Sequence, residues 1–478
     1  MMTLFAGSLS DPSRTSCRRR TEFSCSTAIF VLLIVLVVLR SSVAQDRIIA
    51  LRPSWLLTAT GQPPIREGVV LVRGNRIEAV GTRAATPVPA GAEVIDLAGH
   101  TLLPGLIDTH GHLVLRYGAG GVLGLNAQRR APANEQMLTV VRAARVQLLC
   151  GVTTQRQAGE PNYNDILLRD TVANGMHVGP RLISAGLVIT PTGGHGQYAG
   201  GTDGPEAMRQ AVREGFHRGA EWIKLAHTDV TPATAHISPA EMRAAVEEAH
   251  RLGMKVTVHA TGRWGSAIRT AVEAGADNIE HARPLTPELV ALMLKHGTSA
   301  SLTPMAYIGW RPTTKTWQTM DAGVRSAEEW LNYLAREYEA YRRAHPRQEE
   351  EDRPYEDNEP GRAARDRFQG VRNVQRQYLD AWKAGLPFSL GSDGFYGTLT
   401  LGIEFLVEAG LTPLAAIEAA TRVPARLIGH GDRIGTIEAG KLADLISVEG
   451  NPVEDVRAMR RVRLIMKQGE RFDHLSWR

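Results

Sequence analysis

Short apolar runs alternate with longer amphipathic stretches between residues 99 and 430, and this alternation limits the fold more than any other feature. Two helical patterns, Ala240–Leu252 and Arg263–Ala274, precede the strand-like runs Lys255–His259 and Asn278–His281. Such alternation places parallel strands side by side, because each helix crosses back over the sheet between two strands. We therefore predict an α/β fold, and a closed (β/α)8 TIM barrel is the most economical arrangement at this length.

The two ends of the chain carry a different pattern. Gly68–Val72 and Ile77–Gly81 read as two strands joined by a hairpin turn, and Val462–Met466 reads as a further strand near the C-terminus. We therefore predict one small β-sandwich domain built from both termini, with residues 45–98 as its first part and residues 431–478 as its second.

The N-terminus has the features of a targeting segment. Arg18–Arg20 precede an unbroken apolar run, Ala28–Leu39, and Ser42–Ala44 supply small residues before Gln45. The run is shorter than the roughly 20 residues of a spanning helix. We predict that residues 1–44 form a signal peptide and that the protein is secreted or periplasmic; the alternative is an uncleaved membrane anchor.

Charge and cysteine content narrow the function classes. The formal net charge is +5, and much of the excess lies near the two ends of the chain, so we expect no nucleic-acid partner. Only Cys150 of the three cysteines lies beyond the predicted signal peptide, which rules out an internal disulfide in the mature chain. Its apolar surroundings predict a buried core residue.

A highly charged stretch at residues 310–376 interrupts the alternation. It contains the acidic run Glu349–Asp352 and many arginines. Two interpretations stay open, a solvated insertion and a lid over the barrel mouth, since the loops of a barrel build its site.

Chemistry-bearing residues close several of the predicted strands. The apolar run before Asp108 ends in His110-Gly111-His112, and strand alternation puts the two imidazoles on one face, where they can converge on one metal ion. The runs ending in Lys224, His259, His281 and Asp393 repeat this placement. Because the carboxyl ends of parallel strands share one rim, the six side chains form a candidate site.

These motifs together resemble the amidohydrolase superfamily, and within it the branch of imidazolonepropionase-like proteins and prolidase-like dipeptidases. The resemblance covers the whole mature chain and rests on five segments: Asp108–His112, Val258–Ala260, Ile279–His281, Gly391–Asp393 and Gly435–Leu445.

The resemblance implies a binuclear metal site. His110 and His112 would bind one ion with Asp393, and His259 and His281 the other. Lys224 would be carboxylated by CO2, and its carbamate would bridge the ions. A shared hydroxide would be the nucleophile, and Asp393 would be the catalytic residue that moves its proton. Nitrogen-rich ligands favour two Zn²⁺ ions, although related sites take other divalent ions.

A glycine-rich segment, Thr192–Gly196, is similar to a Gly-Gly-His-Gly stretch of prolidase-like relatives. His195 is a second candidate catalytic residue, because it could hydrogen-bond the substrate carbonyl or its tetrahedral intermediate, and it also counts as a substrate contact. The alternative is a glycine-rich turn with an exposed histidine. Tyr198 is a further candidate substrate contact.

The segments after Lys224 and His259 depart from the family pattern. His227 lies where many relatives have small residues, and Thr261 stands where relatives often have a second histidine. His227, Arg263 and Trp264 are therefore candidate substrate contacts. For each, a purely structural role is the alternative: a loop histidine in one case and a helix start in the other two.

The leading functional hypothesis is hydrolysis of an amide-like C–N bond, in a dipeptide or an N-acyl amino acid. Hydrolysis of a cyclic amide, carbamate or ester is the alternative, and a non-catalytic binding protein on the same fold is a third. The expected partner is a small-molecule substrate. The resemblance also implies a homo-oligomer, and membrane anchorage follows if the N-terminal segment is uncleaved.

Overall fold

The computed structural model describes residues 47–115, 130–197, 200–307, 336 and 359–475. The chain divides into Met1–Arg47 and Ile48–Arg478, and the description below concerns the second unit. The predicted signal peptide, Tyr198 and most of the charged stretch 310–376 lie outside the described residues. Among the described helices, none has the length and apolar character needed to cross a membrane.

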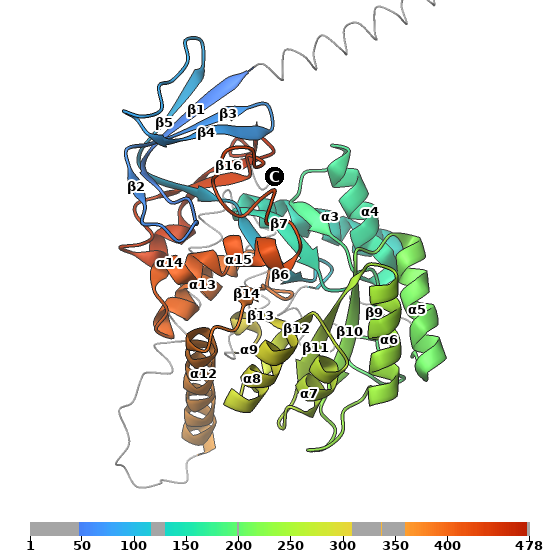
Figure 1. Ribbon diagram of the computed structural model, residues 1–478. Coiled ribbons are helices and arrows are strands. Elements are labelled where there is room, and N and C mark those ends of the chain that lie inside the picture. Colours follow the sequence, from blue (N-terminus) through green and yellow to red (C-terminus); the bar gives the residue numbers. More distant parts are fainter. Residues whose placement is uncertain (1–46, 116–129, 198–199, 308–335, 337–358, 476–478) are drawn as a thin grey trace, which may run out of the picture. The chain divides into compact units, whose positions relative to one another are not determined.

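Parallel strands form the centre of the second unit (Figure 1). Six of them form one sheet in the order β14-β13-β12-β11-β10-β9, and every pairing in it is parallel. Their bounds are β9 (Val188–Ile189), β10 (Trp222–Thr228), β11 (Lys255–Thr261), β12 (Asn278–Arg283), β13 (Ser299–Leu302) and β14 (Phe388–Leu390). A second parallel sheet contains β6 (Leu106–Gly111), β7 (Val152–Gln157) and β8 (Arg181–Ile183). The predicted α/β fold is confirmed.

The two parallel sheets contact each other in two places. A parallel bridge joins Gly111, at the end of β6, to Asp393, just after β14. The carbonyl of Ser184, just after β8, accepts the backbone N–H groups of Glu221 at 2.8 Å and Trp222 at 3.3 Å, at the start of β10, which is the neighbour of the edge strand β9. These contacts are compatible with a closed barrel, and closure stays a prediction.

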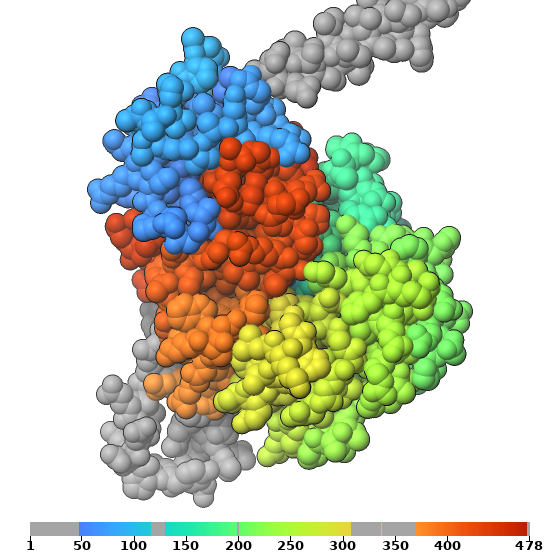
Figure 2. Space-filling model, in the orientation of Figure 1, coloured from blue at the N-terminus to red at the C-terminus, as the bar shows by residue number. Residues whose placement is uncertain are grey.

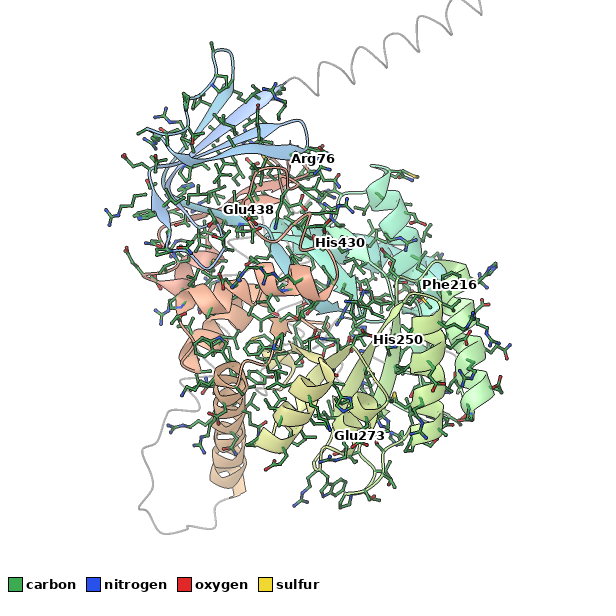
Figure 3. All side chains as sticks on the ribbon, in the orientation of Figure 1. Arg76, Phe216, His250, Glu273, His430 and Glu438 are labelled. Atoms are coloured by element: carbon green, nitrogen blue, oxygen red, sulfur yellow. The ribbon has the colours of Figure 1, made fainter. Side chains whose placement is uncertain are left out.

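Helices follow most of the parallel strands, as crossover connections require (Figure 1). Their bounds are α3 (Ala133–Leu149), α4 (Asn164–Ala173), α5 (Pro205–Arg218), α6 (Pro239–Arg251), α7 (Ser266–Glu273), α8 (Pro287–His296), α9 (Pro304–Tyr307), α12 (Glu359–Lys383), α13 (Leu399–Glu408), α14 (Pro413–Glu418) and α15 (Arg422–Leu427). Short 3-10 turns span Pro161–Tyr163 (η1) and Val456–Arg460 (η2). In Figure 3, His250 of α6 and Glu273 of α7 lie on the helical layer.

The helix boundaries have local causes. α6 begins at a capping box, in which Ser238 Oγ accepts from the Glu241 N–H while the Glu241 carboxylate accepts from the Ser238 N–H. The helix expected to begin at Arg263 begins at Ser266 instead. The Asp229 carboxylate accepts the backbone N–H groups of Trp264 and Gly265, at 2.7 and 2.8 Å, and so holds these residues outside the helix.

Both chain ends contribute to one eight-stranded sheet, whose main path runs β17-β16-β15-β5-β1-β3-β4, with β2 paired to β1. The bounds are β1 (Ile48–Leu56), β2 (Ile65–Arg66), β3 (Gly68–Arg73), β4 (Arg76–Thr82), β5 (Glu93–Pro104), β15 (Leu445–Glu449), β16 (Val462–Lys467) and β17 (Glu470–Arg471). Figure 2 shows the N-terminal residues in blue against the C-terminal residues in red. A second packed sheet, as a sandwich requires, stays a prediction.

Apolar side chains hold this terminal sheet together. Leu51, Leu56, Val70 and Leu102 are fully buried and belong to one cluster. The segment that returns from the parallel strands is held by Arg76, whose side chain donates to the Gly440 carbonyl at 2.5 Å. β5 runs on towards β6 with Gly105 between them, so the sheet and the candidate site share one continuous stretch of chain.

Candidate metal centre

The ends of β6 and β14 are fastened together at the centre of the candidate site. The Asp393 N–H donates to the His110 carbonyl at 2.7 Å, and the His112 N–H donates to the Asp393 carbonyl at 3.2 Å. Gly391 makes this approach possible, because a Cβ there would overlap His110. Residues far apart in the sequence are thereby held in one place by the backbone itself.

The buried carboxylate of Asp108 stabilises the contact between the ends of β6 and β14. Its Oδ1 accepts the His110 N–H at 3.0 Å and the Ser392 N–H at 3.1 Å, and its Oδ2 accepts from Gln147 at 2.8 Å. Burial raises the pKa of its carboxyl to about 6, although the hydrogen bond from Ser392 opposes the shift. Asp108 therefore fixes the two segments that carry His110 and Asp393.

His110, His112 and Asp393 form a group whose ligand atoms all lie within 4.8 Å of one another. Nε2 of His110 is 3.5 Å and Nε2 of His112 is 3.8 Å from Asp393 Oδ1. Both ring nitrogens of His110 are buried. Nε2 forms no hydrogen bond with any residue that the structure describes, and Nδ1 lies 3.1 Å from a Glu280 carboxylate oxygen without the angle of a regular hydrogen bond. Buried polar atoms are normally paired, so this donor set fits a divalent cation.

The backbone carbonyl of Gly159 orients the second histidine. It lies 2.9 Å from Nδ1 of His112, which places the proton on Nδ1 and leaves the Nε2 lone pair on the side of Asp393. Metal-binding histidines commonly donate their second nitrogen in this way.

Two further histidines lie against this group. The ring centroids of His110 and His281 are 4.6 Å apart, and those of His259 and His281 are 4.4 Å apart. Nδ1 of His281 contacts Thr303 Oγ1 at 2.6 Å. Burial holds the pKa of His110, His259 and His281 well below the usual 6.5, and nearby Lys224 and histidines add to this shift. Neutral imidazoles keep the lone pair that a metal needs.

Lys224 points into the same interior from β10. It is 2 % exposed, and burial together with the nearby Arg156 charge holds the pKa of its amine well below 10.5. A neutral amine is nucleophilic, which is the form that reacts with CO2. The six predicted ligands are therefore all buried, and ring or ion-pair contacts link most of them.

The backbone is unusual at two of these positions. His281 has a φ of 65° and Asp393 a φ of 57°, the left-handed region that non-glycine residues rarely adopt. Such strain costs of order 1–3 kcal/mol and persists where surrounding contacts hold it. The sharp turns aim both side chains inward at the ends of their strands.

His195 lies beside the candidate ligands, and its role as a catalytic residue stays a prediction. Its ring stacks on His259, with centroids 4.2 Å apart and an angle of 21° between the planes, while His195 itself is exposed. This places an imidazole at the open side of the candidate ligands. Tyr198, from the same loop, lies outside the described residues.

The remaining predicted contacts have structural partners. His227 is out of phase with Lys224 on β10, is fully buried, and accepts the Ile237 N–H through Nδ1 at 3.0 Å. Burial lowers its pKa to about 4. This placement favours the structural alternative for His227, and its substrate contact stays a prediction.

Arg263 and Trp264 are exposed in the loop between β11 and α7, and Trp264 is 44 % exposed. Asp229 clamps this loop: besides the two N–H groups above, its Oδ1 accepts from the Ala267 N–H at 2.7 Å and Ser266 Oγ at 2.8 Å. The loop therefore presents both side chains to solvent from a fixed backbone. Their role as substrate contacts stays a prediction.

Sequence reasoning missed two buried charges under the ligands. Glu280, which has no exposed surface, and Arg156, which is 1 % exposed, face each other at 3.4 Å. Both lie within strands whose residues are almost all buried. Glu280 directly precedes the predicted ligand His281, which was the signal that could have found it, whereas the polar sequence of β7 gave no such signal for Arg156.

Comparison with known protein families shows to which family the chain belongs. Residues 101–471 match the pattern described as the amidohydrolase family. The chain belongs to the amidohydrolase family. Members of this family are metal-dependent. Family membership also makes the chain a hydrolase that acts on carbon–nitrogen bonds. The predicted resemblance is confirmed.

Individual members of the amidohydrolase family are similar over most of the chain. Ochratoxinase from Aspergillus niger is 25% identical over 463 residues, covering 88% of this chain and 85% of that protein. Imidazolonepropionase from Streptomyces griseus subsp. griseus is 26% identical over 291 residues, covering 55% and 70%. A solved Xaa-Pro dipeptidase with methionine bound in its active site is 25% identical, with a TM-score of 0.69 and coverage of 89% and 99%.

Proposed function

We propose that this amidohydrolase uses two metal ions to cleave an amide-like C–N bond in a dipeptide or an N-acyl amino acid, on a (β/α)8 barrel. The observation that carries the proposal is the convergence of four histidines, one lysine and one aspartate in a buried site along the parallel strands and just after β14. Each side chain offers a nitrogen or oxygen donor that suits zinc.

The residues divide into two ligand sets. His110, His112 and Asp393 would hold one ion, and His259 and His281 the other. Lys224 would join the sets as a carbamate, which replaces a cationic ammonium by an anionic group. When bound, the ions lower the pKa of water and polarise the scissile carbonyl.

Two side chains move or stabilise charge in this scheme. Asp393 takes a proton from the attacking water and passes it to the leaving amine. His195, stacked on His259, donates a hydrogen bond to the carbonyl oxygen as negative charge develops there. The burial of Asp393 strengthens the first effect, because water screens charges less inside the site.

The names of relatives support this substrate class. The Xaa-Pro dipeptidase and a prolidase complexed with N-methylphosphonate-L-proline are both 25% identical to the chain. The match to imidazolonepropionases favours a second candidate, hydrolysis of a cyclic amide, with carbamates and esters in the same class.

A substrate screen with a metal count tests the proposal. Protein loaded with Zn²⁺ is assayed for metal per chain, then offered dipeptides, N-acyl amino acids and their matched esters and cyclic amides, with chelator-treated protein as the control. We expect about two ions per chain and hydrolysis of the linear amides. One ion per chain at full activity would contradict the binuclear site. Turnover of cyclic amides alone would establish the second candidate.

We further propose that residues 1–44 direct export and that the mature enzyme, secreted or periplasmic, assembles as a homo-oligomer. N-terminal sequencing of the mature protein should begin at Gln45. Retention of residues 1–44 in a membrane fraction would instead establish the anchor.

A further inference from the structure

Glu280 is buried next to His281 on β12, and both face the same interior. Neighbouring residues of a regular strand point to opposite faces. The left-handed φ of 65° at His281 breaks this alternation and lets both side chains turn inward. Glu280 has no exposed surface, so its carboxylate must be placed by its partners.

Those partners are two predicted metal ligands and one cation. Oε2 of Glu280 lies 3.1 Å from Nδ1 of His110 and is in direct contact with Nζ of Lys224. Oε1 lies 3.4 Å from the Arg156 guanidinium. One carboxylate therefore touches a member of the first ligand set, the bridging lysine and a buried counter-charge.

Arg156 is itself held in place. Its Nε donates to the Thr109 carbonyl at 2.8 Å, its Nη2 donates to Asn278 Oδ1 at 2.9 Å, and its guanidinium lies 4.5 Å from the centre of the Trp222 ring. A planar cation fixed by several contacts is a rigid anchor for a carboxylate.

We propose that Glu280 is a positioning residue that orients His110 and carboxylated Lys224 as metal ligands, with Arg156 as its anchor. The proposal rests on the metal site of the proposed function. It assigns Glu280 no contact with the substrate or with the reacting atoms.

The hydrogen-bonding chemistry of the two ligands leads to this role. If Nδ1 of His110 carries the proton and directs it to Glu280, Nε2 keeps its lone pair on the side of Asp393, 3.5 Å from Oδ1. The Gly159 carbonyl does the same for His112. A carboxylate is the stronger acceptor of the two, and it increases the basicity of the ligand.

The contact between Glu280 and Lys224 can persist after Lys224 is carboxylated. The carbamate nitrogen retains one N–H, which can donate to Oε2 of Glu280, and this bond turns the carbamate oxygens away from Glu280. Glu280 thus fits the lysine both before and after its modification.

The test is Zn²⁺ affinity, measured by chelator competition on full-length protein. Glu280→Gln keeps the shape and removes the charge, and we expect Zn²⁺ to bind about 10–100-fold more weakly. The matched control is Glu404→Gln. Glu404 is also a buried carboxylate paired with an arginine, Arg460, at 2.5 and 2.6 Å, but it lies on α13. Wild-type Zn²⁺ affinity in Glu280→Gln would overturn the proposal.

A double variant separates positioning from simple charge balance. Arg156→Gln with Glu280→Gln removes both buried charges, so a purely structural role predicts recovery of both stability and Zn²⁺ affinity. We expect stability to recover while Zn²⁺ affinity stays low, and recovery of both would overturn the proposal.

Two further results keep the test decisive. If Glu280→Gln does not fold, the tautomer of His110 is read in zinc-loaded wild-type protein with ¹⁵N-labelled histidine: a proton on Nδ1 supports the proposal and one on Nε2 overturns it. If wild-type protein binds no Zn²⁺, the proposed function itself is wrong. That outcome is distinct from a failure confined to Glu280.

Discussion

The interior lined by the parallel strands and the core of the terminal sheet are both buried, but the first is rich in polar groups and the second is apolar. The first contains Arg156, Asn278 and Glu280, linked by hydrogen bonds or ion pairs to several buried serines and threonines. The second is apolar, with Leu51 and Val70 among its fully buried members. Apolar burial contributes stability without direction, whereas a polar network contributes direction at a desolvation cost.

The comparison shows that different regions orient the candidate metal ligands and contribute the apolar burial that stabilises the fold. Polar groups under the ligands fix where each ligand points, because every hydrogen bond has a preferred angle. The terminal sheet, which β5 connects to β6, adds apolar burial to the same folding unit. Substitutions in the two regions should therefore change different quantities.

The largest effect is expected at the centre of the polar region. Lys224→Ala should remove at least one metal ion and lower kcat/KM by roughly ten-thousandfold, since a bound ion supplies several kcal/mol of transition-state stabilisation. Metal analysis and steady-state kinetics measure both. Lys295→Ala, an exposed lysine of α8, is the control. Full metal content in Lys224→Ala would contradict the binuclear site.

Asp393→Asn tests proton transfer in the same region. The amide keeps the size of the side chain and cannot accept the proton, so kcat should fall by about a thousandfold. Metal content is measured in parallel, because Asp393 is also a proposed ligand. If metal and turnover both persist, the proton-transfer role is wrong.

Leu51→Ala tests the apolar region. It should lower the free energy of unfolding by about 2–5 kcal/mol through lost burial and a cavity, while kcat and KM of the folded enzyme stay unchanged. Urea unfolding and kinetics on the same preparation measure this. Leu138→Ala, a leucine that is 74 % exposed, serves as the control. A change in kcat for Leu51→Ala would break the comparison between the two regions.

A smaller effect, dependent on pH, belongs to the parallel-strand region. Asp165 on α4 is buried, and burial raises its pKa from 3.8 to about 7. Between these values the folded chain keeps a proton that the unfolded chain has lost. The stability contribution is therefore complete below about pH 4 and lost as the pH rises through 7.

Asp165→Asn should remove this decrease in the free energy of unfolding with rising pH, which amounts to at most about 4 kcal/mol. Urea unfolding of both proteins at several pH values measures it, with the exposed Asp96→Asn as the control. Parallel stability curves for wild type and Asp165→Asn would contradict the shifted pKa.

The sequence predicted the α/β class and the strand ends because both depend on short-range periodicity. Strand alternation was enough to place His110 and His112 together. Lys224 reaches the same interior, but from the third residue of β10 and not from the end of the strand. The role of Glu280 could not be predicted, since it depends on the register between strands and on the left-handed φ at His281. The start of α7 was misjudged because Asp229, in the segment after β10, sets it.

The Asp229 clamp has a consequence for engineering the loops of this enzyme. Its carboxylate, at the end of β10, holds the loop after β11 that presents Trp264. The segment after β10 and the loop after β11 therefore depend on each other for their conformation. A Cβ at Gly262, in the second of them, would collide with Asp229 in the first. A loop from a relative that replaces the β11–α7 loop will keep its conformation only if the relative's segment after β10 is transferred together with it.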